Sequence, residues 1–164
     1  MIKKIFATIF KMTILFLGCV TVFSFVDGTI PNPFLSKPSI PVLMSEVQKV
    51  KIREATFNVD IAINEESRAL GLSGRSYLSV LQGMLFVFES SDAHLFWMKG
   101  MLFPIDIIWI DENKQIMEIA EDVQPNSFPK QFGSNKKSLY VLEIPAGTAE
   151  RFNFKIGDTV EFLR

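Results

Sequence analysis

Short hydrophobic segments that alternate with polar residues, separated by turn-forming residues, constrain the fold of this chain more than any other feature. In TFNVDIAI, residues 56–63, the odd-numbered positions hold Phe, Val, Ile and Ile, and the even-numbered positions hold polar or small residues. A period of two predicts a β-strand with one face on a core and the other in water. Comparable segments predict further strands over residues 83–90, 95–99, 105–111, 114–122, 139–145 and 158–163.

Local signals between these segments predict how the strands are joined. In NEESRALGL, residues 64–72, Asn64 can cap a short helix and Gly71 can end it. The polar DENK, residues 111–114, predicts a hairpin, and residues 124–138 predict a loop. Many short strands with one or two short helices indicate a mainly β (α+β) domain. We expect a compact single domain built as a curled antiparallel sheet or a barrel-like structure.

The first 28 residues have the layout of a secretory signal. Lys3 and Lys4 precede an apolar run that is interrupted by Lys11 and ends at the polar Asp27. The uncharged run of residues 12–26 is shorter than the ~20 residues of a membrane-spanning helix, but a span that includes Lys11 is possible if this side chain snorkels. A cleaved signal peptide and an uncleaved membrane anchor are both open. Either predicts an exported, periplasmic or extracytoplasmic domain, held at the inner membrane in the second case.

The positions of the prolines indicate where the folded domain begins, and the net charge limits the possible partners. Residues 29–46 carry four prolines and predict an extended tether, so the folded domain is expected to cover residues 47–164. Without residues 1–28 the chain has 14 basic and 17 acidic residues, a formal charge of −3. This balance argues against nucleic acid as a partner and leaves the membrane, through the N-terminal segment, and an unknown small molecule or protein.

Residues that could start covalent catalysis are scarce. Cys19 is the single cysteine, so no disulfide can form within the chain. FLGC at residues 16–19 is similar to the end of a lipoprotein signal, but Phe16 and the apolar residues that follow favour an inert thiol. His94 is the single histidine, and no Gly-x-Ser-x-Gly motif or glycine-rich phosphate loop is present. We therefore expect no catalytic residue and no bound cofactor.

Asp106 is the most unusual residue in the strand segments, because FPIDIIWI surrounds its carboxylate with apolar side chains. A buried charge must be paired, hydrogen-bonded or protonated. We favour a structural carboxylate that accepts backbone N–H groups or pairs with Arg68 or Lys99. A positioned acid, base or ligand is the alternative.

His94, Met98 and Met101 combine an imidazole with two thioethers, which are possible ligands of Cu(I). Their spacing is loose and methionine commonly fills cores, so no metal site is predicted. Trp97 and Trp109 lie on neighbouring predicted strands and could form an aromatic wall. Core positions are favoured for both, and a binding pocket is expected at whichever one is exposed.

Four blocks of the sequence, SRALGLSGRSYL, GMLFVF, FWMKGMLFPIDIIWID and YVLEIPAGTAERFNFKIGDTV, resemble the family known as domain of unknown function 192, or the UPF0127 proteins. The resemblance covers about residues 56–162 and implies a compact β-rich domain without an established reaction. Among the positions on family motifs are Arg68, Trp97, Lys99, Asp106 and Glu143. Ser73 stands where the family usually has Met, and Gly100-Met101 stands where it usually has Asn-Thr.

These observations favour an exported or membrane-tethered accessory module that binds a ligand or partner without catalysis. Its candidate binding residues are Arg68, Trp97, Lys99, Asp106, Trp109 and Glu143. An enzyme that uses Asp106, Glu143 and Lys99 in one cleft is the first alternative. A copper-handling protein and a purely structural role for all these residues are the others.

Overall fold

The computed structural model describes residues 44–133 and 135–164. The predicted signal or anchor, Cys19 and nearly all of the tether lie outside these residues. Within the described part of the chain, no helix is long and apolar enough to cross a membrane.

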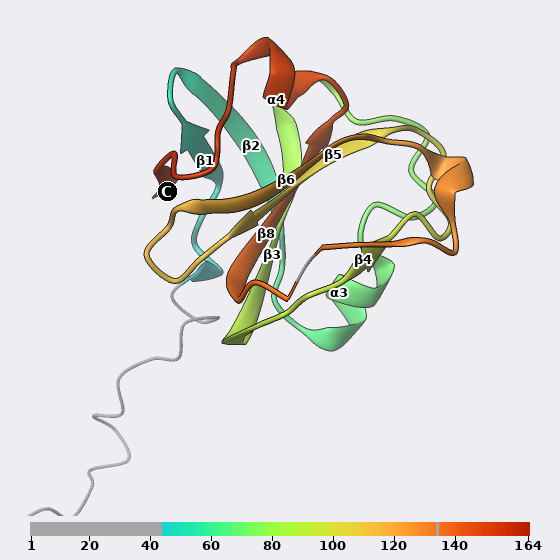
Figure 1. Ribbon diagram of the computed structural model, residues 1–164, viewed down its shortest axis with the longest axis horizontal. Coiled ribbons are helices and arrows are strands. Elements are labelled where there is room, and N and C mark those ends of the chain that lie inside the picture. The colour runs from blue at the N-terminus through green and yellow to red at the C-terminus, as the bar shows by residue number, and fades with distance from the viewer. Residues whose placement is uncertain (1–43, 134) are drawn as a thin grey trace, which may run out of the picture. The chain divides into compact units, whose positions relative to one another are not determined.

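The domain is mainly β, as predicted, with two short α-helices. Seven strands form one sheet in the order β6-β5-β8-β3-β2-β1-β9, and β4 and β7 form a separate pair (Figure 1). The strands are β1 Lys49–Ile52, β2 Ala55–Ala62, β3 Gln82–Asp92, β4 Phe96–Trp97, β5 Ile105–Ile110, β6 Ile116–Val123, β7 Gln131–Phe132, β8 Ser138–Pro145 and β9 Val160–Leu163. The helices are α3 Glu65–Leu70, the 3-10 helix η1 Pro125–Ser127 and α4 Thr148–Arg151.

The sheet curls until its two outer edges meet at one end. An isolated bridge joins Gln115, just before β6, to Thr159, just before β9. The amide of Ile116 donates to the Asp158 carbonyl over 3.0 Å, and the Gly157 amide donates to the Ile116 carbonyl over 2.8 Å. These contacts confirm the curled, barrel-like prediction.

The prediction of an antiparallel sheet is wrong for one pair of neighbours, because β2 and β3 run parallel. A parallel pair needs a crossover connection that returns the chain to the starting end of the first strand. Residues 63–81, which contain α3, form this connection. The crossover places α3 beside the sheet, where it contributes to the candidate site.

The local signals for α3 and for the β5–β6 hairpin are confirmed. The Asn64 side chain accepts a hydrogen bond from the amide of Ser67 over 2.8 Å, and Gly71 ends the helix at φ 52°. In the hairpin, the Asp111 carboxylate accepts the amide of Gln115 over 2.8 Å. The expected loop at residues 124–138 contains η1 and β7. The sequence reading missed β1, β7 and α4.

Alternation along the central strands divides the apolar residues between two cores. Ile108, Ile110 and Leu142 face the cluster enclosed by the curled sheet. Ile107 and Trp109, on the other face of β5, belong to a second cluster that includes Met98 and Met101 from the β4 segment. The second core therefore lies between the outer face of the sheet and the β4 segment.

Candidate functional site

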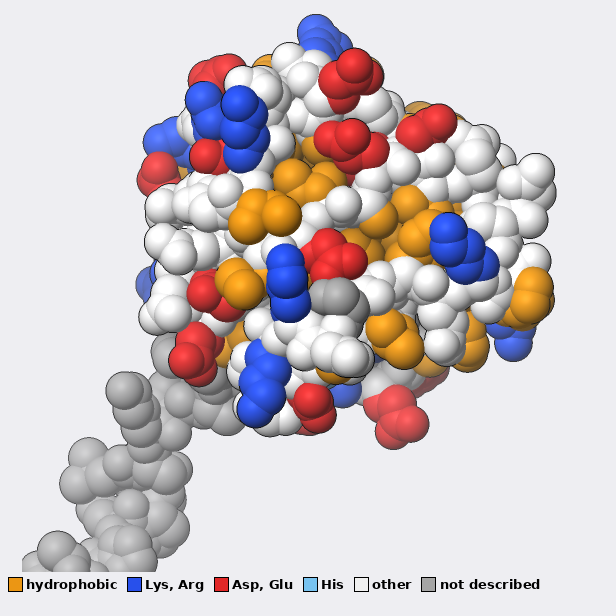
Figure 2. Space-filling view, viewed as in Figure 1, with side chains coloured by type: hydrophobic (Ala, Val, Ile, Leu, Met, Phe, Trp, Pro, Cys, Tyr) orange, Lys and Arg blue, Asp and Glu red, His pale blue; other side chains and the backbone are white. Residues whose placement is uncertain are grey.

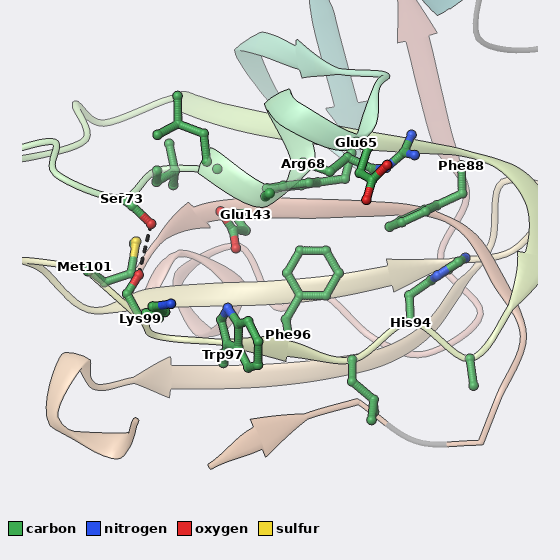
Figure 3. Close-up of a pocket in the computed structure, with 18 residues that line it drawn as sticks. Glu65, Arg68, Ser73, Phe88, His94, Phe96, Trp97, Lys99, Met101 and Glu143 are labelled. Atoms are coloured by element: carbon green, nitrogen blue, oxygen red, sulfur yellow. Dashed lines mark hydrogen bonds between the residues drawn. The ribbon is translucent and has the colours of Figure 1, made fainter. Parts of the chain in front are cut away.

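A cavity of about 650 Å³ opens beside the second core, between α3 and the β4 segment (Figure 3). Both elements cover the outer face of the central strands, and β3 and β8 supply the rest of the lining. The lining residues are Glu65, Arg68, Ala69, Leu70, Gly71, Leu72, Ser73, Phe86, Phe88, Ala93, His94, Leu95, Phe96, Trp97, Lys99, Gly100, Met101 and Glu143. Four of the six predicted binding residues are in this set: Arg68, Trp97, Lys99 and Glu143.

Glu143 supplies a carboxyl group from the middle of β8. It is the cross-strand partner of Met84 in β3 and Ile107 in β5, so its side chain shares their outer face of the sheet. Figure 3 shows this carboxyl directed between α3 and the β4 segment. Glu143 is only 5% exposed, and its Oε2 has no hydrogen-bond partner among the described residues.

Burial is the main influence on the chemistry of Glu143. It raises the pKa of the carboxyl to about 8, although the positive charge of Arg75 acts in the opposite direction. Glu143 is therefore mainly protonated at neutral pH, as an uncharged group with an O–H donor and a carbonyl acceptor. A buried polar atom without a hydrogen-bond partner costs free energy, and such atoms are rare in folded proteins.

Asp106 lies on the opposite face of the sheet from Glu143, because its cross-strand partner is Ile144. It is fully buried, and its Oδ1 accepts the amides of Asp122 over 2.8 Å and Gly147 over 3.1 Å. Its Oδ2 accepts the amide of Ala149 over 2.8 Å. The carboxylate thus anchors the start of α4, which confirms the favoured structural reading.

Two alternatives that involve Asp106 are not found in the described part of the chain. Of the two partner types considered for this carboxylate, the structure shows backbone amides and no pair with Arg68 or Lys99. Asp106 does not line the cavity that holds Glu143 and Lys99, so the proposed catalytic set of these three residues is not assembled there.

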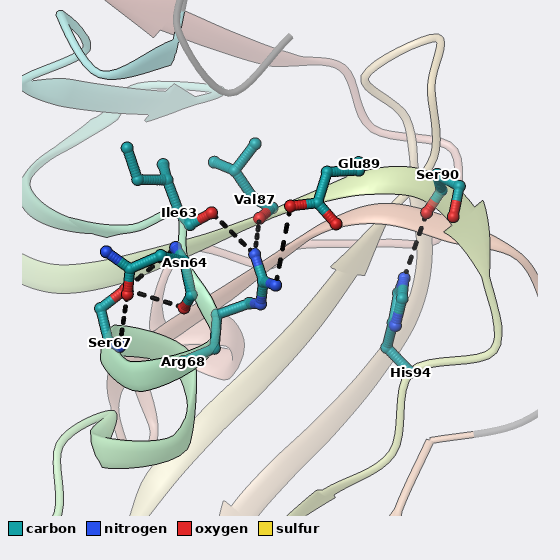
Figure 4. A network of polar contacts seen from close by, with 8 residues as sticks. All are labelled: Ile63, Asn64, Ser67, Arg68, Val87, Glu89, Ser90 and His94. Carbon is teal, nitrogen blue, oxygen red and sulfur yellow. Dashed lines mark hydrogen bonds and ion pairs between the residues drawn. The ribbon is translucent and has the colours of Figure 1, made fainter. Parts of the chain in front are cut away.

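Arg68 connects α3 to the sheet (Figure 4). Its guanidinium donates to the carbonyls of Ile63 over 2.8 Å and Val87 over 3.0 Å, and it lies 4.0 Å from the Glu89 carboxylate. It also lies 5.2 Å from the centroid of the Phe88 ring. Arg68 thus fixes the position of α3 in the cavity wall and also supplies a positive charge.

The two tryptophans have different environments. Trp97 is 51% exposed and lines the cavity, so the core reading is wrong for this residue. Trp109 is 2% exposed and its indole N–H donates to the His94 carbonyl over 2.7 Å, so the core reading is confirmed. Because Trp109 does not line the cavity, the two residues do not form a common wall there.

Phenylalanines form the wall that the sequence reading assigned to tryptophan. The Phe96 ring packs edge-on against Phe86 at 4.9 Å and against Trp109 at 6.1 Å, measured between ring centroids. Phe88 is stacked on the His94 ring at 3.4 Å. Alternation in GMLFVF could have identified Phe86 and Phe88 as neighbours on one face of β3, but it could not show which face carried the cavity.

The possible copper ligands do not share the cavity. Met98 is a core residue at 1% exposure and is not part of the lining, whereas His94 and Met101 are. The His94 ring is stacked on Phe88, and burial lowers the pKa of its imidazole. Among residues 44–133 and 135–164, no group of three or more His, Cys, Asp or Glu side chains could hold a metal ion.

The departures from the resembled family meet at one end of the cavity. Ser73, Gly100 and Met101 all line it. The Ser73 hydroxyl donates to the Lys99 carbonyl over 2.9 Å. A Cβ at Gly100 would lie 3.2 Å from the Ser73 Cβ, so Gly100 allows a close approach between the α3–β3 connection and the β4 segment. At this end of the cavity, Ser73 and Gly100 occupy little side-chain volume.

Comparisons with known proteins agree with this architecture. The model of the DUF192 family, described as uncharacterized ACR, matches residues 47–162. A crystal structure of a protein of unknown function from Novosphingobium aromaticivorans DSM 12444 is 30% identical with a TM-score of 0.67, over 70% of this chain and 84% of that chain. A candidate transcription regulator from Sinorhizobium meliloti 1021 is 29% identical with a TM-score of 0.65, over 70% of this chain and 90% of that chain. No curated protein matches the chain. The family match covers most of the chain, and the protein belongs to the DUF192 family.

Proposed function

We propose that this domain is a non-catalytic binding module that holds a small organic molecule in the cavity between α3 and β4. The observation that carries the proposal is the Glu143 carboxyl, which is buried and directed into the cavity, and whose Oε2 has no partner in the part of the chain that the structure describes. Small-molecule sites typically combine apolar walls with a few polar groups that fix the orientation of the ligand. The lining of this cavity has that composition.

The size of the cavity supports the same proposal. A volume of about 650 Å³ lies within the range of roughly 300–1,000 Å³ that is typical of small-molecule sites. The exposed Trp97 ring provides a flat apolar surface at the cavity, and Trp97 packs edge-on against Phe128 at 6.2 Å between centroids. A ligand that covered Trp97 would remove apolar area from water, which favours binding.

The polar groups of the cavity do not form a nucleophile with an adjacent base. The Ser73 hydroxyl donates to a backbone carbonyl, and the His94 ring is stacked on Phe88. Nucleophilic catalysis by serine requires the hydroxyl and a base within hydrogen-bond distance of each other. These contacts support a binding role over hydrolysis.

We further propose that the N-terminal segment exports the domain or tethers it to the inner membrane.

Native mass spectrometry of the full chain, purified from its own host, tests the binding proposal. We expect an excess mass in the wild type and in the control Tyr77→Ala, whose exposed ring lies outside the cavity lining. Trp97→Ala should lose this mass. As a second measurement, the indole N–H signal of Trp97 should shift on titration with a panel of small carboxylates, alcohols and amines. A bare mass in all three proteins together with an unshifted indole signal would overturn the proposal.

A further inference from the structure

We infer that the ligand of this cavity is an organic anion, with a carboxylate as its polar head and an apolar body. This inference rests on the proposed function and specifies its ligand class. Three features of the lining carry it: the excess of cations, the uncharged donor at Glu143, and the apolar surface between them.

The cations of the cavity outnumber its ionised acids. Arg68 and Lys99 are positively charged, and Glu65 on α3 is the negative group beside them in the lining. Glu143 is mainly uncharged at neutral pH, and burial keeps His94 neutral by lowering the pKa of its imidazole. The lining therefore carries one net positive charge, of which the exposed Glu89 carboxylate, 4.0 Å from Arg68 and outside the lining, offsets a part. The positive group that an entering anion would meet is Lys99.

Lys99 is the cation best suited to meet the ligand. Its backbone is held by the Ser73 hydroxyl over 2.9 Å, but its ammonium makes no hydrogen bond or ion pair with any residue that the structure describes. Figure 3 shows its side chain at the same end of the cavity as Ser73, Met101 and Trp97. Arg68, in contrast, already donates to two backbone carbonyls and contributes mainly through its charge.

Protonated Glu143 complements a carboxylate. Its O–H can donate to an anionic oxygen, and hydrogen bonds to an ionised acceptor are stronger than those between neutral groups. A cationic ligand would instead require Glu143 to ionise in a buried position. The apolar body of the ligand would lie against Phe96 and Trp97, both of which line the cavity.

The inference is tested by a matched pair of probes, phenylacetate and phenylacetamide, which share a ring and differ in charge. Binding of each to the full chain is measured at pH 7 by isothermal titration calorimetry. We expect phenylacetate to bind at least tenfold more tightly than phenylacetamide. Lys99→Gln should abolish most of this preference, and the control Lys49→Gln, on β1 outside the cavity lining, should retain it.

The dependence on pH provides a second readout. The charged or titratable groups around Glu143 are Glu65, Arg68, His94 and Lys99 in the lining, and Arg75, whose charge acts on it. Deprotonation of Glu143 removes the O–H donor and adds a negative charge, so phenylacetate affinity should fall between pH 7 and pH 9. In Glu143→Gln, where the amide is always neutral, the affinity should stay nearly constant over this range.

The outcomes separate the two proposals. Equal or tighter binding of phenylacetamide would overturn the anion inference and leave small-molecule binding intact. Retention of the full preference in Lys99→Gln would also overturn the inference as stated, since Lys99 would not meet the carboxylate. Failure of both probes to bind, with no shift of the Trp97 indole signal for any compound in the panel, would count against the proposed function itself.

Discussion

Two buried carboxyl groups lie on the neighbouring strands β5 and β8, offset by one residue in the strand register, and they have different roles. Asp106 in β5 and Glu143 in β8 belong to adjacent cross-strand pairs, Asp106 with Ile144 and Ile107 with Glu143. The shift of one residue sends the two side chains to opposite faces of the sheet. Asp106 accepts three backbone amides, whereas Oε2 of Glu143 has no partner among the described residues.

The difference shows how a buried acid can be classified by its partners. Hydrogen bonds from several amides stabilise an ionised carboxylate, and such a group contributes to folding. A buried carboxyl that faces a cavity without a partner does not stabilise the fold when it ionises, and it is free to contact a ligand. Asp106 therefore serves stability, and Glu143 serves binding.

The largest effect is expected from removal of the Asp106 carboxylate. Asp106→Ala leaves the amides of Asp122, Gly147 and Ala149 without their acceptor, and it releases the start of α4 from β5. We expect the free energy of unfolding to fall by about 4 kcal/mol, as measured by urea denaturation at pH 7. Glu143→Gln is the matched control and should not lower it, because the neutral amide avoids the cost of ionising a buried carboxyl. A small loss in Asp106→Ala would contradict the structural assignment.

The second effect is a loss of stability as the pH rises. The folded domain holds the Glu143 proton more tightly than the unfolded chain does, because burial raises the pKa from 4.5 to about 8. The stabilisation is complete below about pH 4.5 and is lost as the pH rises towards 8, with a slope approaching 1.4 kcal/mol per pH unit. We expect the wild type to lose about 3 kcal/mol relative to Glu143→Gln between pH 5 and pH 8. Parallel stability curves for the two proteins would contradict the burial of an unpaired carboxyl.

The third effect separates binding from stability at the cavity wall. Trp97→Ala removes a half-exposed ring from the lining, so ligand affinity should fall about tenfold while the free energy of unfolding changes by less than about 1 kcal/mol. Titration of both proteins with phenylacetate measures the first quantity, and urea denaturation measures the second. A large loss of stability with unchanged affinity would place Trp97 among the core residues.

The smallest effect is expected at Ser73. Ser73→Ala removes the hydroxyl that donates to the Lys99 carbonyl over 2.9 Å at an exposed position. We expect a loss of about 0.5 kcal/mol in the free energy of unfolding, together with a twofold to threefold loss of phenylacetate affinity as the Lys99 backbone becomes less fixed. Ser79→Ala, outside the cavity lining, is the control and should leave the affinity unchanged.

Features with local causes were predictable from the sequence. Asn64 and Gly71 delimit α3, and DENK at residues 111–114 forms the β5–β6 hairpin, because caps and turns depend on neighbouring residues. The partners of Asp106 could not be identified individually, since they lie 16, 41 and 43 residues away in the chain.

The cavity itself was only partly predictable. Sequence reasoning selected Arg68, Trp97, Lys99 and Glu143 as candidates, but their convergence depends on the crossover that places α3 beside the β4 segment. The distribution of charged residues did not indicate where the cavity lies either, because acidic and basic side chains are interspersed over the face of the molecule in Figure 2. The register between β5 and β8, which separates Glu143 from Asp106, is a tertiary property.

The most direct test of this division is a pH titration of the Glu143 carboxyl by ¹³C NMR, in the full chain with and without phenylacetate. We predict a midpoint near pH 8 in the free protein and a higher midpoint with phenylacetate, because the anion binds best when Glu143 is protonated. A midpoint near the ordinary value of 4.5 that does not move when phenylacetate is added would contradict the account.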